Sequence, residues 1–302
     1  MLLKRIISAV LLLGSAALLL FVFPAVMGVL VLMAATVLGL LEFYGILNKA
    51  GIPAFRLLGI GCGLALLAGL YLSLNAALLL PPSLARLAAE APMLLFALIL
   101  FAVCIRQFPQ KLNPQPLATI ACTMLGVLYV PFLLAFIMFL AFRWEPVAWS
   151  KPFGDTARAL IFYLVVVVKS SDIGAFAVGR TFGRHKLFPR ISPGKTWEGL
   201  AGGLAAGILM SVLIFWWLGR GQPHTSLGVL VVTRTDAWVL GAVLSSIGVV
   251  GDLIESLLKR SAGLKDSGST IPGMGGILDV LDSLLFAAPA LYFYLLWAAV
   301  VH

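Results

Sequence analysis

The sequence predicts an all-α, polytopic integral membrane protein, and three observations carry this prediction. Hydrophobic residues make up 62% of the 302 residues and charged residues only 11%, whereas soluble domains carry about 45–50% apolar and about 25% charged residues. About nine apolar segments approach or reach the roughly 20 residues that a spanning helix needs. No segment outside them is long enough to fold by itself. We therefore predict one membrane domain over residues 1–302.

The nine candidate spans are residues 6–23, 25–43, 57–80, 92–106, 117–141, 159–178, 197–218, 237–257 and 278–300. The first follows two basic residues, as a signal peptide would. Its apolar run is longer than the usual signal-peptide core and lacks a small-residue cleavage site, so we expect a retained helix. The short fourth span, and the short connection between the first two, leave a range of eight to ten spans open.

Basic residues indicate the orientation of these spans. With the N-terminus in the cytoplasm, the cytoplasmic end and loops carry 14 basic residues and the opposite side carries 6, as the positive-inside rule requires. The polar loops 179–196 and 258–277 then face the cytoplasm. We interpret the net charge of +9 first as topology and attraction to anionic lipid headgroups. Binding of an anionic substrate is a second interpretation of this charge. We expect no nucleic-acid partner.

Acidic residues separate the chain into two parts. The first 150 residues contain only Glu42, Glu90 and Glu145, so we describe 1–158 as a helical bundle. Most of the other acidic residues fall inside or beside the later spans, where an unpaired carboxylate is costly and marks a functional site by default. We therefore expect the chemistry in the helices and cytoplasmic loops of 159–302.

The stretch GDLIESLLKR, residues 251–260, places four polar side chains on one helix face. Asp252, Glu255, Ser256 and Lys259 are spaced by three, four and seven residues, which are neighbouring positions on a helix. The simplest alternative is an ordinary Glu255–Lys259 pair at a helix end. Inside a membrane span, however, acidic residues favour a functional interpretation.

A second acidic pair begins the last span. Asp279 and Asp282 are three residues apart, and one of them could serve simply as a helix cap. A turn of about twenty residues would bring this pair back beside Asp252. Carboxylates that converge from two helices suit Mg²⁺, which takes one or two protein carboxylates and completes its coordination with water and phosphate oxygens.

Both polar loops have features that suit phosphate. Five glycines between positions 263 and 276 permit close backbone approach, and successive amides in such a loop can bind phosphate, although glycines also make plain turns. In the other loop Ser192-Pro-Gly-Lys195-Thr leads into a helix, as phosphate-contacting turns do. It lacks P-loop spacing, and its basic residues could reflect topology alone.

The stretch SLLKRSAGLKDSGSTIPGMGGILDVLDS resembles the signature of the phosphatidate cytidylyltransferases, also called CDP-diacylglycerol synthases. The matching positions are Ser256, Lys259, Arg260, Lys265, Asp266, Pro272, Gly273, Gly275, Gly276, Asp279 and Asp282. The block DIGAFAVGRTFGRHKLFPRISPGKTWEG, which begins at Asp172, looks like the family's second characteristic block. The resemblance covers roughly residues 160–290. Met274 and Val280 stand where the family usually has His and Arg.

The resemblance implies that phosphatidate attacks CTP to form CDP-diacylglycerol and diphosphate in phospholipid biosynthesis, with Mg²⁺ and possible help from K⁺. It implies Asp252 and Asp279 as Mg²⁺ ligands, supported by Glu255 and Asp282. Lys259, Arg260 and Lys265 would neutralise phosphates, as would Lys195, with Ser256 as a further phosphate contact. Asp266, Asp172 and Ser192 are weaker site candidates.

The resemblance further suggests a homodimer. We also expect contact with membrane lipids and a bacterial inner membrane, where the distribution of basic residues makes the active site face the cytoplasm. Three alternatives stay open. A CTP-dependent membrane lipid kinase would use the same groups but transfer the γ-phosphoryl group. A non-enzymatic transporter can also combine glycine-broken helices with intramembrane acids. Met274 and Val280 also leave room for a family member that has lost activity.

Overall fold

The structure is a computed structural model that describes residues 14–108, 113–148, 150–219, 224–227, 230–271 and 275–301. Eight helical segments in this part of the chain are long and apolar enough to cross a membrane, which confirms the all-α, polytopic fold class. The first predicted span, 6–23, lies partly outside the described residues, and within them residues 14–21 are helical. The predicted count of nine is therefore not confirmed.

The chain forms two compact units, and the division into 1–158 and 159–302 stays a prediction. One unit contains the residues up to Phe153 together with Ser261–Val280. The other contains Gly154–Arg260 together with the chain from Leu281 onward. The glycine-rich loop that follows residue 260 thus belongs with the N-terminal helices, whereas most of the last helix belongs with the helices after residue 154.

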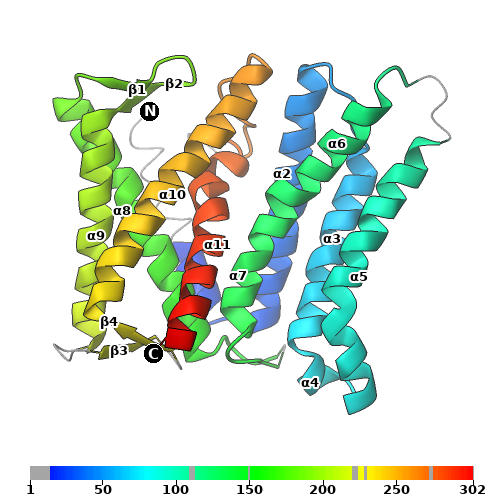
Figure 1. Cartoon of the computed structure of the whole chain (residues 1–302), viewed down its shortest axis with the longest axis horizontal. Helices are drawn as coiled ribbons and strands as arrows, with labels where there is room; N and C mark the ends of the chain where they lie inside the picture. The colour runs from blue at the N-terminus through cyan, green and yellow to red at the C-terminus, as the bar shows by residue number, and fades with distance from the viewer. Residues whose placement is uncertain are drawn as a thin grey trace. The chain divides into compact units, whose positions relative to one another are not determined.

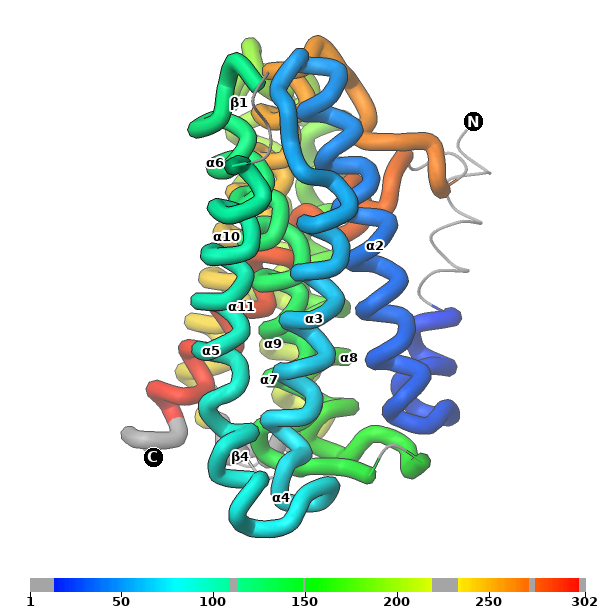
Figure 2. The backbone as a smooth tube through the Cα atoms, turned by 90° about the vertical axis from the view of Figure 1, so that its right-hand side faces the viewer, coloured from blue at the N-terminus to red at the C-terminus, as the bar shows by residue number. Residues whose placement is uncertain are grey.

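The first unit is a helical bundle (Figure 1). In chain order its helices are α2 Ala25–Lys49, α3 Arg56–Leu74, the short α4 Ala76–Leu79, α5 Pro82–Gln107, α6 Pro116–Val127 and α7 Leu133–Phe142. Figure 2 shows α3 and α5 running side by side, with the short α4 at one end between them. A π-helical turn, Leu128–Phe132, joins α6 to α7. Its Pro131 has no amide hydrogen to donate, which is a recognised cause of such interruptions.

Tyr44 organises the centre of this bundle. Its side chain is 3% exposed, and its hydroxyl donates a hydrogen bond of 2.9 Å to the carbonyl of Thr123 on α6. A Cβ atom added at Gly59 on α3 or at Gly126 on α6 would collide with the Tyr44 ring. These two glycines therefore let α3 and α6 close on α2, and the buried phenol finds the partner that it requires.

The second unit is built from α8 Asp155–Phe182, α9 Trp197–Gly219, α10 Arg234–Ser261 and most of α11 Leu278–Val301. Small residues let α8 and α9 approach closely: a Cβ at Gly174 would lie 2.8 Å from the carbonyl oxygen of Gly202, and one at Gly202 would collide with Val178. Because lipid supplies no hydrophobic driving force between helices, such close backbone packing is a main source of association.

Two antiparallel hairpins lie at opposite ends of α9 (Figure 1). The hairpin before it pairs β1 Lys186–Phe188 with β2 Ser192–Thr196, in the region that we predicted only as a basic loop. The hairpin after it pairs β3 His224–Leu227 with β4 Leu230–Thr233. The first hairpin therefore holds the predicted phosphate turn, Ser192–Thr196, in an extended strand that leads directly into α9.

The helices differ from the predicted spans mainly at their ends. The predicted span 159–178 lies within α8, and 237–257 lies within α10. The short predicted span 92–106 is the second part of α5, which continues back through Pro92 to Pro82. Apolarity marks only the stretch that sits in hydrocarbon, whereas a helix continues wherever its backbone hydrogen bonds are satisfied.

Candidate active site

Helix α10 presents the predicted polar face. Lys259 Nζ lies 2.7 Å from Glu255 Oε2, and both side chains are buried. Ser256 Oγ donates a hydrogen bond of 3.3 Å to Asp252 Oδ1. The Glu255–Lys259 pair that we considered as the simplest alternative therefore exists. It is buried rather than solvated, and burying two charges is costly unless they are paired.

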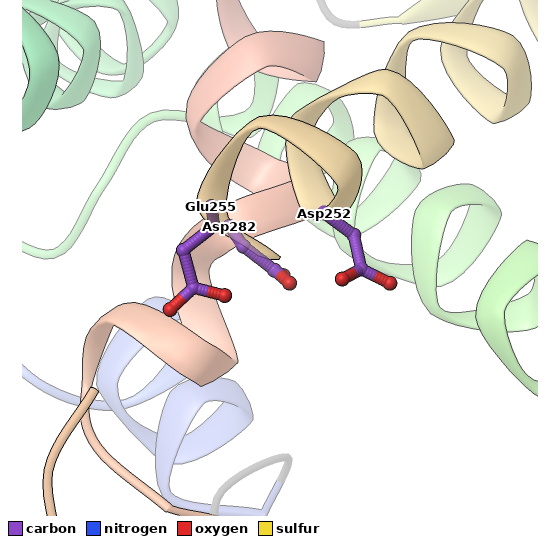
Figure 3. Close-up of side chains that lie close together, drawn as sticks. All are labelled: Asp252, Glu255 and Asp282. Atoms are coloured by element: carbon purple, nitrogen blue, oxygen red, sulfur yellow. The ribbon is translucent and has the colours of Figure 1, made fainter. Parts of the chain in front are cut away.

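Asp282 on α11 joins this face. One carboxylate oxygen from each of Asp252, Glu255 and Asp282 lies within 4.8 Å of the others, and Figure 3 shows the three side chains gathered at one place. A Cβ atom at Gly251 would strike the carbonyl oxygen of Asp282. Glycine at this position thus allows α10 and α11 to approach until their carboxylates meet.

Lys195, at the end of the first hairpin, neutralises part of this acidic group. Its Nζ lies 2.8 Å from Asp252 Oδ2 and donates a hydrogen bond of 3.2 Å to the carbonyl of Val249. The predicted phosphate-binding lysine and the predicted metal ligand are therefore direct neighbours. Ser192 begins the same strand and is partly buried.

A second polar group lies on α8 and α11. Lys169 Nζ is 3.1 Å from Asp172 Oδ2 and 3.1 Å from Ser283 Oγ. The Ser283 hydroxyl in turn donates to Asp172 at 3.2 Å. Ser283 follows Asp282 on α11, and its amide donates a hydrogen bond to Asp282 Oδ1. Asp172, a weaker candidate in the sequence, is therefore linked through Ser283 to the acidic residues of α10 and α11.

Sequence reasoning assigned no role to Lys169. Its position inside a predicted apolar span could have identified it, because a lysine there must have a partner. Together these two groups form one cluster of four carboxylates and three lysines. The carboxylates are at positions 172, 252, 255 and 282, and the lysines are at positions 169, 195 and 259. One negative charge remains, which suits a site that receives a divalent cation together with anionic phosphates.

The other predicted residues lie around this cluster or in the other unit. Arg260 Nε donates a hydrogen bond of 3.2 Å to the carbonyl of Ile191 in the first hairpin. Lys265 and Asp266 follow α10 and are exposed. Pro272, Gly273 and Met274 lie outside the described residues.

Asp279 is not one of the three converging carboxylates in the described part of the chain. Its Oδ2 atom accepts hydrogen bonds from the amide of Gly276 at 2.7 Å and from the amide and hydroxyl of Ser267 at 3.0 and 2.9 Å. In this structure the carboxylate therefore binds the loop that precedes α11. Its assignment as a metal ligand stays a prediction.

Glu42 on α2 is a residue that sequence reasoning missed. Its carboxylate accepts four hydrogen bonds from the same loop and from the start of α11. The donors are Ser267 Oγ, Thr270 Oγ1, and the amides of Ile277 and Leu278. An acidic residue within an apolar span was again the available signal, but nothing local pointed to a partner more than 220 residues away.

Comparison with known proteins gives one family match and several relatives. The model of the cytidylyltransferase family matches residues 3–298. Phosphatidate cytidylyltransferase of Haemophilus influenzae is 42% identical over 138 residues, which is 45% of each chain. The Bacillus subtilis protein of the same name is 44% identical over 135 residues, 45% of this chain and 46% of its own.

The phosphatidate cytidylyltransferase of Pseudomonas aeruginosa is 41% identical over 143 residues, which cover 47% of this chain and 49% of the relative. The matched part of this chain therefore spans about half the length of each of these curated relatives.

Proposed function

Because this chain belongs to the cytidylyltransferase family, we propose that it is a phosphatidate cytidylyltransferase. It would convert CTP and phosphatidate to CDP-diacylglycerol and diphosphate at the membrane. The observation that carries this proposal is the partly buried cluster of four carboxylates and three lysines on α8, α10, α11 and the first hairpin. Related proteins of this name, at about 40% identity over half their length, support the choice of substrate.

The proposed reaction needs no covalent enzyme intermediate. A phosphate oxygen of phosphatidate attacks the α-phosphorus of CTP. The bond from that phosphorus to the bridging oxygen breaks, and diphosphate leaves with the electron pair. The nucleophile is already an anion, so the protein has to align two anionic substrates and offset their charge. Lys195 and Lys259, with Arg260 and Lys265, are the proposed contacts for the phosphates.

The three converging carboxylates of Asp252, Glu255 and Asp282 have the chemistry that the proposed metal, Mg²⁺, prefers. Asp252, with Glu255 and Asp282, would hold the ion, and Asp279 stays a proposed ligand. When bound, the ion supplies positive charge to the phosphate oxygens. K⁺ as a second ion, a homodimer, and a site that faces the cytoplasm are further parts of this proposal.

The test is transfer of label from CTP to lipid by protein purified in detergent, with phosphatidate and Mg²⁺. Label from α-³²P-CTP should enter the lipid extract, and Asp252→Asn should abolish this transfer because it removes a proposed ligand and the partner of Lys195. Asp155→Asn is the matched control, since Asp155 is exposed at the start of α8 and pairs only locally with Arg158.

Two outcomes would overturn the proposal. Label that reaches lipid from γ-³²P-CTP but not from α-³²P-CTP would identify a kinase. Equal transfer by wild type and Asp252→Asn would remove the acidic cluster from the reaction.

A further inference from the structure

Glu42 binds residues on both sides of the loop before α11 by both of its carboxylate oxygens. Oε1 accepts from Thr270 Oγ1 at 2.7 Å and from the amide of Ile277 at 2.9 Å. Oε2 accepts from Ser267 Oγ and from the amide of Leu278, both at 3.0 Å. Leu278 is the first residue of α11 and Ile277 immediately precedes it, so Glu42 satisfies amides at a helix start that the helix cannot satisfy internally.

Glycines in this loop make room for the two carboxylates. A Cβ at Gly268 would lie 2.7 Å from Glu42 Oε1, and one at Gly276 would collide with the Glu42 carboxylate. Gly275 has a φ of 101°, and a Cβ there would strike the Asp279 carboxylate. The backbone therefore passes between Glu42 and Asp279 at a distance that side chains would prevent.

Ser267 links the two acids directly. Its hydroxyl lies 3.0 Å from Glu42 Oε2 and 2.9 Å from Asp279 Oδ2. A hydroxyl has one proton to donate, so a stronger bond to Glu42 weakens the bond to Asp279. Glu42 thus affects Asp279 in two ways, by fixing the start of the helix that carries it and by competing for one of its donors.

We propose that Glu42 is a positioning residue for Asp279, which it holds ready to bind a divalent cation by fixing Ser267, Thr270 and the start of α11. This inference rests on the proposed function only in taking Asp279 as a metal ligand. Glu42 itself binds neither the metal nor a substrate. Partners that orient a metal ligand typically affect metal affinity by about 10–100-fold.

The test measures Mn²⁺ binding by electron paramagnetic resonance in wild type and in Glu42→Gln. Glutamine keeps the shape of the side chain but retains only one acceptor oxygen, so the Mn²⁺ dissociation constant should rise by about 10–100-fold. Amide hydrogen exchange at Ile277 and Leu278 should accelerate in the same variant. Glu90→Gln is the matched control, because Glu90 is an exposed acid in the same unit and should change neither measurement.

A double variant separates positioning from a general effect on stability. If Glu42 acts through Asp279, Glu42→Gln combined with Asp279→Asn should weaken Mn²⁺ binding no more than Asp279→Asn alone. Thr270→Val removes one donor to Glu42 without touching either acid. It should weaken Mn²⁺ binding in the same direction but less, which keeps the test valid if Glu42→Gln folds poorly.

Additive effects in the double variant, or wild-type Mn²⁺ affinity in both Glu42→Gln and Thr270→Val, would overturn the inference. The wild type could transfer label to lipid while Glu42→Gln and Thr270→Val bind Mn²⁺ as tightly as the wild type. That result would overturn this inference and leave the proposed function standing. Glu42-dependent Mn²⁺ binding without any label transfer supports this inference and overturns the proposed function instead.

Discussion

At the scale of single residues, the ammonium group of Lys195 has contacts within the protein and a proposed contact with substrate. It pairs with Asp252 at 2.8 Å and donates to the carbonyl of Val249 at 3.2 Å. In the proposed reaction it must also contact a phosphate. An ammonium has three donors, so these contacts can coexist if the phosphate takes the third. Lys195 would then connect the acidic cluster to the nucleotide.

We expect Lys195→Ala to lower kcat/KM for CTP by about 10–100-fold. A hydrogen bond to a charged group contributes about 1.5–3 kcal/mol, and each 1.4 kcal/mol changes an equilibrium or rate by about tenfold. Steady-state label transfer at varied CTP measures this effect. Lys186→Ala, at an exposed position in the same hairpin, is the control. Equal losses in the two variants would mean that general positive charge matters rather than Lys195.

At the scale of elements, the contact between α8 and α9 decides how the cluster is held. Lys169 and Asp172 lie on α8, and Lys195 lies in β2, two residues before the start of α9. The two helices approach closely because glycines line their contact, among them Gly174 and Gly202. A change in this contact should therefore shift one set of charges against the other as well as weaken the fold.

Gly174→Ala should destabilise the protein by about 1–3 kcal/mol, the usual cost of overpacking, because the new methyl group would press on the backbone of Gly202. Gly61→Ala is the matched control. Gly61 is also helical, with open space around its Cβ position, so alanine there should be neutral or stabilising by up to about 1 kcal/mol. Thermal unfolding in detergent compares the two, and equal midpoints would contradict the packing argument.

At the scale of the whole molecule, the distribution of basic residues predicts the orientation. The α8 helix has 28 residues, about 42 Å at 1.5 Å per residue, which exceeds the ~30 Å hydrocarbon thickness. Its two ends must then lie on opposite sides of the membrane. Basic residues concentrate after its C-terminal end, so we predict that the first hairpin faces the cytoplasm.

Cysteine labelling tests this orientation in a variant whose three native cysteines are replaced by alanine. A membrane-impermeant maleimide should label Lys186→Cys only from the cytoplasmic side of the membrane. It should label Asp155→Cys, at the other end of α8, only from the opposite side. Labelling in the reverse pattern would place the proposed active site outside the cytoplasm.

The sequence by itself determined the features that depend on local order. Apolar runs located the eight candidate membrane spans of the described residues, because hydrocarbon excludes charge over a fixed thickness. Helical periodicity placed Asp252, Ser256 and Lys259 on one face. The matching residues between Ser256 and Asp282 indicated the family. Helix ends and the first hairpin were less predictable, since backbone hydrogen bonding rather than apolarity sets them.

Tertiary structure decided which of these groups meet. Spacing puts Asp279 and Asp282 on one face of α11 alike, but the absence of a side chain at Gly251 lets α10 close on Asp282. The partners of Glu42, and the Ser283 partner of Lys169, lie more than 100 residues further along the chain. No local pattern encodes such contacts, because they arise only when whole helices pack and each charge in an apolar span has to find its opposite or a donor.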